Sequence, residues 1–210
     1  MSPDRNRSDV AAVRDPAFIT AATTEHFVLQ SAAATTVTEA SSRASLYALT
    51  LSSSLVAMGF TVKTEAFAPL AATVLPVIVL LGIFTTVRLV DTGVQNVQIL
   101  SAIARIREYY RTLASDGAFY FPSYADSDVD EALASLATRR KLTTVLFTMA
   151  SMVAIINSVV AGAGVTLLLG NWISRVQAVL SGAAVAALFV AAFLRYQNKR
   201  YNALKLAPIR

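Results

Sequence analysis

Four long stretches of this chain contain no charged side chain. They run from Ala44 to Val62, Phe67 to Val87, Leu142 to Leu169 and Val176 to Leu194. An α-helix rises about 1.5 Å per residue and needs about 20 apolar residues to cross the hydrocarbon layer of a membrane. The runs are rich in Ala and Leu and lack the alternation of a barrel strand. The sequence therefore predicts an all-α membrane protein with four transmembrane helices.

The composition agrees with lipid as the solvent. Apolar residues make up 55% of the chain and charged residues 15%, whereas soluble chains have about 45–50% and about 25%. The absence of cysteine excludes disulfides, thiolate nucleophiles and cysteine-ligated metals. A single histidine, His26, leaves little for metal or proton-relay chemistry.

The distribution of basic residues predicts the orientation. The two short loops between runs hold only Lys63 and Arg175, and the other 16 of the 18 Lys and Arg lie in the terminal regions and the middle segment. The positive-inside rule then places both termini and the middle segment in the cytoplasm of a multi-pass protein of the cell's inner (plasma) membrane. The net charge of +5 suits the anionic inner leaflet. Because no nucleic-acid module is recognisable, we expect no nucleic-acid partner.

We divide the chain into two regions. Residues 1–20 are polar and mixed in charge, without the apolar core of a signal peptide, and are expected to form a disordered cytoplasmic tail. Residues 21–210 are expected to form one four-helix transmembrane domain with cytoplasmic helical extensions. Helical spacing continues past the second run to about residue 113, and residues 194–206 extend the fourth. Thr24 is the expected N-cap of the extension before the first run.

One face of the first run carries polar or small residues from end to end. It consists of Arg43, Tyr47, Thr50, Ser54, Ala57, Thr61 and Glu65. Spacings of three and four residues place them on the same side of a helix. Around the axis of a homo-oligomer, this stripe would line a pore with a ring of Glu65 carboxylates at its mouth. Such rings attract cations.

Close packing of helices is the alternative use of this face. Small and hydroxylated residues let helices approach in lipid, and Ser45, Ser52 and Gly59 form a neighbouring small face. Small residues also recur every four positions in the third and fourth runs. The three rows are Ala150, Ala154, Ser158 and Gly162; Ala178, Gly182 and Ala186; and Ala183, Ala187 and Ala191. This abundance predicts that some of them contact other subunits.

Polar residues near the runs have candidate structural partners. Asn157 lies inside the third run, where an amide is expected to bond across a helix contact. Arg88 and Asp91 are spaced to pair with each other, or with Glu39 and Arg43. Glu39, Arg88 and Asp91 could form an inner gate or latch. The alternative is that these side chains extend to the membrane interface.

The middle segment, between the second and third runs, contains a set of aromatic residues and an acidic run. Aromatic residues are expected to fold the loop marked by Gly117 and Pro122 back onto the helix, and a ligand pocket is the alternative. They are Tyr109, Tyr110, Phe119, Tyr120, Phe121 and Tyr124. The acidic run from Asp126 to Glu131 lacks the glycine and the twelfth-position carboxylate of a calcium loop, so we expect a helix start instead. The sequence predicts no catalytic residues, no metal site and no cofactor.

The first run resembles the first span of Orai-type calcium channels. The similarity covers Ala-Ser-Ser-Arg-Ala-Ser from Ala40 to Ser45 and the pair Ala57–Met58. It implies four spans, cytoplasmic termini and a hexameric pore lined by the first span. The selectivity glutamate of that family aligns with Met58, about two turns before Glu65. The complete chain looks like uncharacterised four-span membrane proteins of actinobacteria, a resemblance that implies no activity.

Two functions follow from these patterns. The first is a homo-oligomeric membrane channel, for cations attracted to Glu65, with the first span lining the pore. The second is a non-conducting signalling or interaction protein whose cytoplasmic helical extension binds a soluble partner. Neither is an enzyme. Which helix lies innermost in the assembly would discriminate between them.

Overall fold

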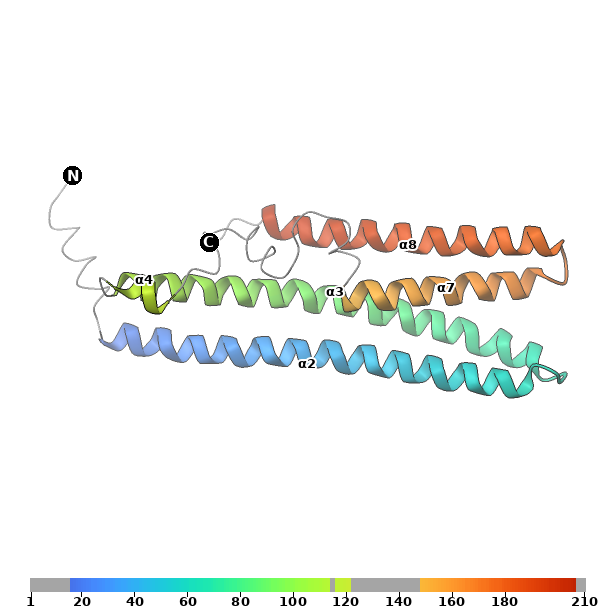
Figure 1. The fold of residues 1–210 in the computed structure, drawn as a ribbon, viewed down its shortest axis with the longest axis horizontal. Helices are drawn as coiled ribbons and strands as arrows, with labels where there is room; N and C mark the ends of the chain where they lie inside the picture. Colours follow the sequence, from blue (N-terminus) through green and yellow to red (C-terminus); the bar gives the residue numbers. More distant parts are fainter. Residues whose placement is uncertain (1–15, 114–115, 122–147, 207–210) are drawn as a thin grey trace. The chain divides into compact units, whose positions relative to one another are not determined.

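The structure is a computed structural model that describes residues 16–113, 116–121 and 148–206. Within these ranges the chain is helical and contains no strand (Figure 1). The elements are α2 (Pro16–Thr61), α3 (Phe67–Thr112), α4 (Gly117–Tyr120), α7 (Met149–Leu169) and α8 (Arg175–Leu206). All except α4 are long and apolar enough to cross a membrane. The prediction of an all-α chain with four such helices is confirmed.

The chain divides into two compact units. The first, here called the aromatic unit, comprises Met1–Val37 and Gln95–Arg140. The second, here called the span unit, comprises Thr38–Val94 and Lys141–Arg210. Both α2 and α3 contribute to each unit. The aromatic unit adds α4 to them, and the span unit adds α7 and α8.

The start of α2 differs from the expectation. The helix begins at Pro16, so residues 16–20 are helical and do not belong to the expected tail. Proline suits the first turn of a helix, because the amide hydrogen it lacks would have no partner there. Thr24 is not an N-cap: it lies inside α2, and its hydroxyl donates to the Thr20 carbonyl at 3.0 Å. Residues 1–15 lie outside the described ranges.

The predicted helical extensions are present. α3 is 46 residues long and continues to Thr112 despite an internal proline at position 76. Likewise, α8 continues from the fourth run to Leu206. Long apolar helices tolerate proline when neighbouring groups satisfy the freed carbonyl.

The third helix begins later than its apolar run. Thr148 is the N-cap, and its hydroxyl oxygen accepts a hydrogen bond from the Ser151 amide at 3.2 Å. The helix therefore starts at Met149 and not at Leu142. Residues 142–147, Tyr124 and the acidic run from Asp126 to Glu131 lie outside the described ranges.

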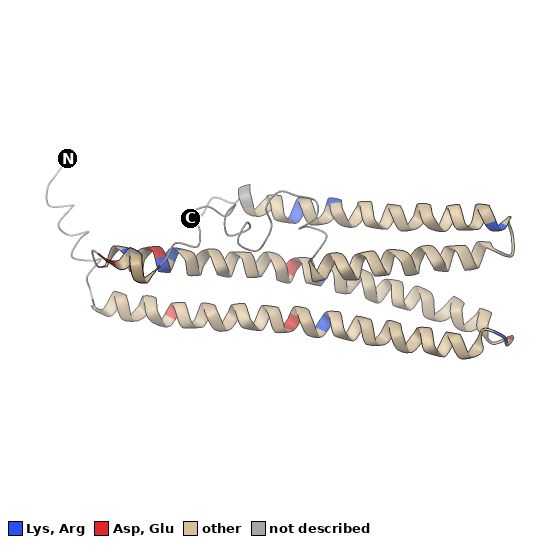
Figure 2. Ribbon diagram, in the orientation of Figure 1, with Lys and Arg blue, Asp and Glu red and all other residues tan. Residues whose placement is uncertain are grey.

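The core of the span unit draws residues from all four of its helices. It contains Ala44, Tyr47, Leu51, Ile78, Leu89, Val90, Ala150, Val153, Ala154 and Phe193. Charged residues are sparse around it, and Figure 2 shows α7 without any charged side chain. Apolar side chains are also exposed along the outside of these helices, including Phe60, Phe84 and Leu188. An uncharged helix that exposes apolar side chains is suited to lipid.

Glycines bring α7 and α8 together. A methyl group added at Gly162 would lie 2.5 Å from the Gly182 carbonyl oxygen and 3.1 Å from the Ala186 Cβ. A methyl group at Gly182 would in turn overlap the Gly162 carbonyl and the Thr166 hydroxyl. The predicted packing role of these two positions is therefore confirmed, because only glycine leaves room for the neighbouring backbone.

Candidate functional sites

The residues of the stripe predicted on the first span differ in exposure: one is buried, and the others are exposed or half-buried. Tyr47 faces inward and is 2% exposed, whereas Arg43, Thr50 and Ala57 are exposed. Ser54 and Thr61 are half-buried. The buried face of α2 contains Ala44, Leu51 and Met58 beside Tyr47. In this protomer the stripe therefore flanks the packed face of the helix, and its Tyr47 is part of the core.

Glu65 does not continue the helical stripe. α2 ends at Thr61, and the Thr64 amide donates to the Thr61 carbonyl at 2.8 Å in the turn that follows. Glu65 is exposed in this turn. The prediction that one helix carries all seven residues is wrong at its last member, because the chain must reverse before α3 begins at Phe67.

Asn157 bonds to two other helices, as its position predicted. The Tyr47 hydroxyl donates to Asn157 Oδ1 at 3.3 Å, and Asn157 Nδ2 donates to the Val79 carbonyl at 3.2 Å. The amide lies against Gly82, where an added methyl group would overlap it. One polar side chain therefore connects α2, α3 and α7. Bonds of this kind hold helices together where water is absent.

Two exposed hydroxyls of the first span, those of Thr50 and Ser53, are satisfied by their own helix. Thr50 donates to the Leu46 carbonyl at 2.8 Å, and Ser53 donates to the Leu49 carbonyl at 2.9 Å. Hydroxyls bonded in this way can face lipid at little cost. The stripe therefore does not require water, although its oxygen lone pairs remain able to contact an ion.

Each residue predicted to form an inner gate or latch is in an ion pair, but Asp91 is not paired with the other two. Glu39 Oε1 accepts from Arg43 Nε at 2.9 Å and from Arg88 Nε at 3.3 Å. The proposed pairing of Arg88 with Asp91 does not occur. Asp91 instead accepts from Arg200 Nε at 3.0 Å and from Arg200 Nη2.

These pairs connect α2 to α3 and α3 to α8. Their side chains are between 32% and 52% exposed. Exposed ion pairs contribute little stability because water screens them. They can instead fix which helices are neighbours and in what register. The Arg200 contact was missed because nothing in the spacing of residues along α8 indicates that it faces α3.

Small residues on α8 divide between two faces. Ala178 and Gly182 are buried against α7, and Ala186 is half-buried. The second row, Ala183, Ala187 and Ala191, is exposed in the protomer. The described helices of one chain therefore use the first row and leave the second uncovered.

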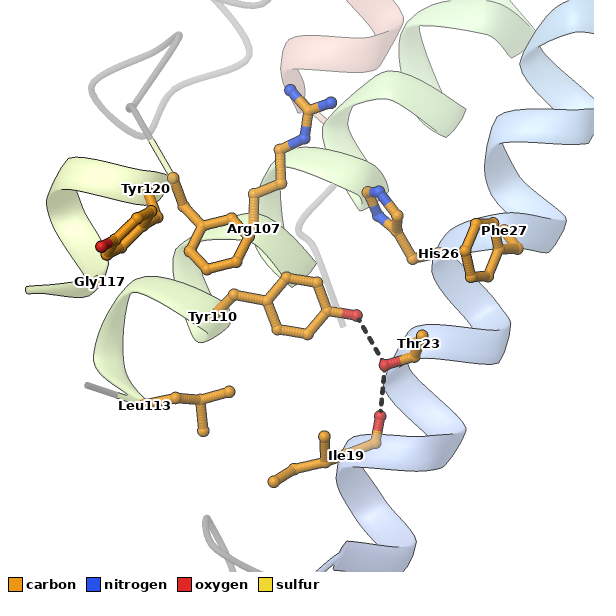
Figure 3. Close-up of a pocket in the computed structure, with 10 residues that line it drawn as sticks. Ile19, Thr23, His26, Phe27, Arg107, Tyr110, Leu113, Gly117 and Tyr120 are labelled. Carbon is orange, nitrogen blue, oxygen red and sulfur yellow. Dashed lines mark hydrogen bonds between the residues drawn. The ribbon is translucent and has the colours of Figure 1, made fainter.

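The aromatic unit contains a cavity of about 830 Å³. Figure 3 shows residues of α2, α3 and α4 around it. Those from α2 are Ile19, Thr23, His26 and Phe27; those from α3 and its end are Arg107, Tyr110 and Leu113; those from α4 and its end are Gly117, Tyr120 and Phe121. Tyr110, Tyr120 and Phe121 belong to the aromatic set that the sequence singled out. The α2 residues were missed, because their neighbours on α3 lie about 80 positions away in the chain.

Aromatic contacts hold the walls of this cavity. The Tyr110 and Phe121 ring centroids are 5.5 Å apart, and those of Tyr110 and His26 are 6.0 Å apart. Such pairs stabilise by about 0.5–1.5 kcal/mol beyond the area they bury. They bring α4 back onto α3, as predicted for the segment after α3. α4 itself is a single helical turn where the sequence indicated a loop.

Two of the hydroxyl groups at the cavity, those of Thr23 and Tyr110, already donate within the protein. The Tyr110 hydroxyl donates to Thr23 Oγ1 at 3.4 Å, and the Thr23 hydroxyl donates to the Ile19 carbonyl at 2.9 Å (Figure 3). Both protons are used, so these two groups can offer only lone pairs to a ligand.

A neighbouring side chain orients His26. Gln30 Nε2 lies 3.0 Å from His26 Nε2. Because an amide nitrogen only donates, the ring accepts at Nε2 and carries its hydrogen on Nδ1. His26 Nδ1 is buried without a hydrogen-bond partner among the described residues. Burial, followed by the charge of Arg107, lowers the pKa of His26 below its ordinary value of 6.5.

The described residues contain no candidate metal-binding cluster. No group of three His, Asp or Glu side chains gathers within residues 16–113, 116–121 and 148–206. Comparison of the whole chain with protein-family models, curated proteins and solved structures finds no match.

Proposed function

We propose that this is a non-conducting, multi-pass protein of the inner membrane whose helical extension binds a soluble partner. The observation that carries the proposal is the cavity in the aromatic unit. A cavity of about 830 Å³ is within the range of about 300–1,000 Å³ typical of ligand sites. The four apolar helices serve as the anchor, and the extension provides the recognition surface in the cytoplasm.

A site-specific photo-crosslinker tests this proposal. Benzoylphenylalanine is placed at Phe27, which lines the cavity and is 66% exposed, or at Leu188 on α8, which is also 66% exposed. After irradiation of intact cells, mass spectrometry is expected to find a soluble adduct at position 27 that position 188 lacks. Identical lipid or self-adducts at both positions would contradict the proposal.

A homo-oligomeric cation channel is the second candidate. It is favoured by Arg43, Thr50 and Ala57, which remain exposed along one line of α2. The exposed row at Ala183, Ala187 and Ala191 offers a surface for self-association. In this arrangement Glu65 would attract cations from the turn after α2, and Glu39 would offset the charge of Arg43.

Cysteine accessibility discriminates between the two candidates, because the natural chain contains no cysteine. Thr50→Cys, Leu49→Cys and Tyr47→Cys are treated with a charged, membrane-impermeant thiol reagent. A pore predicts modification at position 50 alone, because Leu49 is rotated by about 100° from Thr50 around α2 and lies outside the stripe, and Tyr47 is buried. The anchor proposal predicts no modification at any of the three.

Planar-bilayer recording completes this comparison. The channel predicts current from the wild type that changes in Ser54→Gly, since Ser54 belongs to the stripe. Absence of current for both proteins under varied voltage, calcium and pH would contradict the channel. A reproducible, cation-selective current would instead contradict the non-conducting proposal.

A further inference from the structure

One face of α8 is apolar for most of its length and basic at its end. This face, here called the outer face of α8, consists of Leu180, Ala184, Leu188, Ala191, Arg195 and Lys199. Successive members are three or four residues apart, which places them along the same side of the helix. All six are exposed, and the two leucines are 63% and 66% exposed. The described part of the chain therefore leaves this face uncovered.

The length of the uncharged part of α8 places the two cations of this face at a membrane surface. The run from Val176 to Leu194 contains no charge (Figure 2). As a helix it is about 28 Å long, close to the hydrocarbon thickness of about 30 Å. When α8 crosses a membrane, Arg175 and Arg195 therefore lie at its opposite boundaries. Lys199 is one turn beyond Arg195, at the level of the lipid headgroups.

The two cations are not neutralised by the protein. Three other arginines of the span unit are paired with carboxylates, two of them with Glu39 and the third, Arg200, with Asp91. Within residues 16–113, 116–121 and 148–206, neither Arg195 nor Lys199 forms an ion pair. Their positive charges therefore favour an anion from outside the protein.

The charge pattern of this face favours a lipid over a second copy of the chain. Copies inserted into one membrane share an orientation, so a symmetric contact through this face would place Arg195 and Lys199 against their own counterparts. Like charges at that distance repel each other. An anionic phospholipid has the complementary pattern, with a phosphate next to its acyl chains. With the phosphate at Arg195, a chain that reaches the middle of the membrane would lie along Leu188 and Ala184.

We propose that the outer face of α8 binds an anionic phospholipid of the bilayer, with its phosphate at Arg195 and Lys199 and an acyl chain along Leu188. The inference goes beyond the proposed function, because this ligand is held in the membrane and not by the aromatic unit. A zwitterionic lipid brings its own ammonium group, which competes with the two cations for the phosphate. Attraction of anionic lipid by a basic residue near the surface corresponds to a preference of about fivefold per residue.

Quenching of a tryptophan by brominated lipid tests the inference. Trp172→Phe combined with Leu188→Trp moves the single tryptophan of the full chain to the outer face. The protein is reconstituted in mixtures of phosphatidylglycerol and phosphatidylcholine, and in each series one of the two lipids carries bromine in its acyl chains. We expect phosphatidylglycerol to be preferred at this tryptophan by at least fivefold. Native mass spectrometry of the natural chain, with both lipids added, should show the same preference.

Matched variants locate the headgroup. Arg195→Gln and Lys199→Gln should each lower the preference by about fivefold, and the two together should abolish it. Arg175→Gln removes the same charge from the other end of α8, at the opposite boundary, and should preserve the preference. Circular dichroism compares the helix content of the variants, so that a loss of fold is not mistaken for a loss of lipid binding.

Three results would overturn the inference. Equal quenching by the two brominated lipids would mean that the face does not select anionic lipid. An equal loss in Arg195→Gln and Arg175→Gln would mean that the effect comes from net charge and not from a site. Absence of quenching by either lipid would mean that protein, such as a second copy of the chain, covers the face.

Discussion

The span unit and the aromatic unit are built from the same two long helices but packed by different means. In the span unit, glycines bring backbones together at Gly162 and Gly182, and the buried amide of Asn157 connects three helices. In the aromatic unit, rings such as Tyr110 and Phe121 separate the helices. The glycine contacts of the span unit leave no gap between the backbones, whereas the rings of the aromatic unit leave a cavity of about 830 Å³.

The difference is the one expected of a span unit in lipid and an aromatic unit in water. Apolar side chains gain nothing by moving from lipid into a protein interior, because both are apolar. Helices in lipid therefore associate through close backbone approach and interhelical hydrogen bonds. In water, large rings stabilise a contact by the apolar area they bury. Rings cannot fill every gap between two helices and a single turn such as α4. A binding site is therefore more readily formed in the aromatic unit.

The largest expected effect tests the glycine contact in the span unit. Gly162→Ala should destabilise the protein by about 1–3 kcal/mol, because its methyl group meets the Gly182 backbone. Gly59→Ala is the control, since nothing lies within 4 Å of a methyl group there. Thermal unfolding in detergent is followed by the fluorescence of Trp172, the single tryptophan. Equal melting temperatures for the two variants would contradict the packing described.

A smaller effect is expected at the buried amide. Asn157→Leu keeps the approximate side-chain size but leaves the Tyr47 hydroxyl without its partner, and should cost about 1 kcal/mol. Tyr47→Phe should cost less, and its effect should disappear in the Asn157→Leu background. A double-mutant cycle measures this coupling. Additive effects of the two substitutions would mean that the hydrogen bond contributes nothing.

The third prediction tests whether the two units are stabilised separately. Tyr110→Leu removes the ring contact with Phe121 and the hydrogen bond to Thr23, and should weaken the aromatic unit by about 0.5–1.5 kcal/mol. Hydrogen exchange should accelerate around Tyr110 and remain unchanged in α7. Tyr120→Leu, at a 68% exposed position, is the milder control. Faster exchange throughout α7 would show that the units do not unfold separately.

The smallest effect concerns protonation in the aromatic unit. The single histidine gives one titration curve by NMR, and burial with the charge of Arg107 should place the pKa of His26 below 6.5. Arg107→Gln should raise this pKa toward 6.5, and Arg105→Gln should change it less. An unshifted titration in the wild type would contradict the burial of the ring.

The same shift has a consequence for stability. A lowered folded-state pKa means that the unfolded chain binds more protons than the folded chain between the two pKa values. The contribution of His26 is therefore present above pH 6.5 and is lost as the pH falls through that value toward the folded-state pKa. The opposite slope in a pH series of thermal unfolding, absent in His26→Gln, would contradict this sign.

Local sequence was sufficient for the helices and for some contacts. The uncharged runs predicted four helices of spanning length, and their rows of small residues predicted that Gly162 and Gly182 lie at helix contacts, as they do. Asn157 was correctly expected to bond across helices, since an amide in an apolar run has few other partners. These features depend on residue type and helical period alone.

Contacts between distant segments could not be predicted in the same way. Local spacing offered Glu39 as a partner of Arg88, but it gave no indication that Arg200 pairs with Asp91. Helical spacing placed Tyr47 in the stripe with Thr50, but it did not show that Tyr47 faces Asn157. The start of α2 at Pro16 differs from the predicted cap at Thr24, because a threonine inside a helix can donate to the carbonyl one turn before it, as Thr24 does to Thr20.

By itself, the sequence determined that four helices of this protein can cross a membrane, because hydrogen bonds along each helix and the absence of charge are local properties. The tertiary structure decided which side of α2 is buried and where a cavity forms. Helical period specifies which residues share a face, but the neighbouring helix selects the face that packs. Tyr47 of α2 is on the packed side because its hydroxyl bonds to Asn157 of α7. Likewise, Tyr110 and Phe121 line the cavity beside His26 of α2.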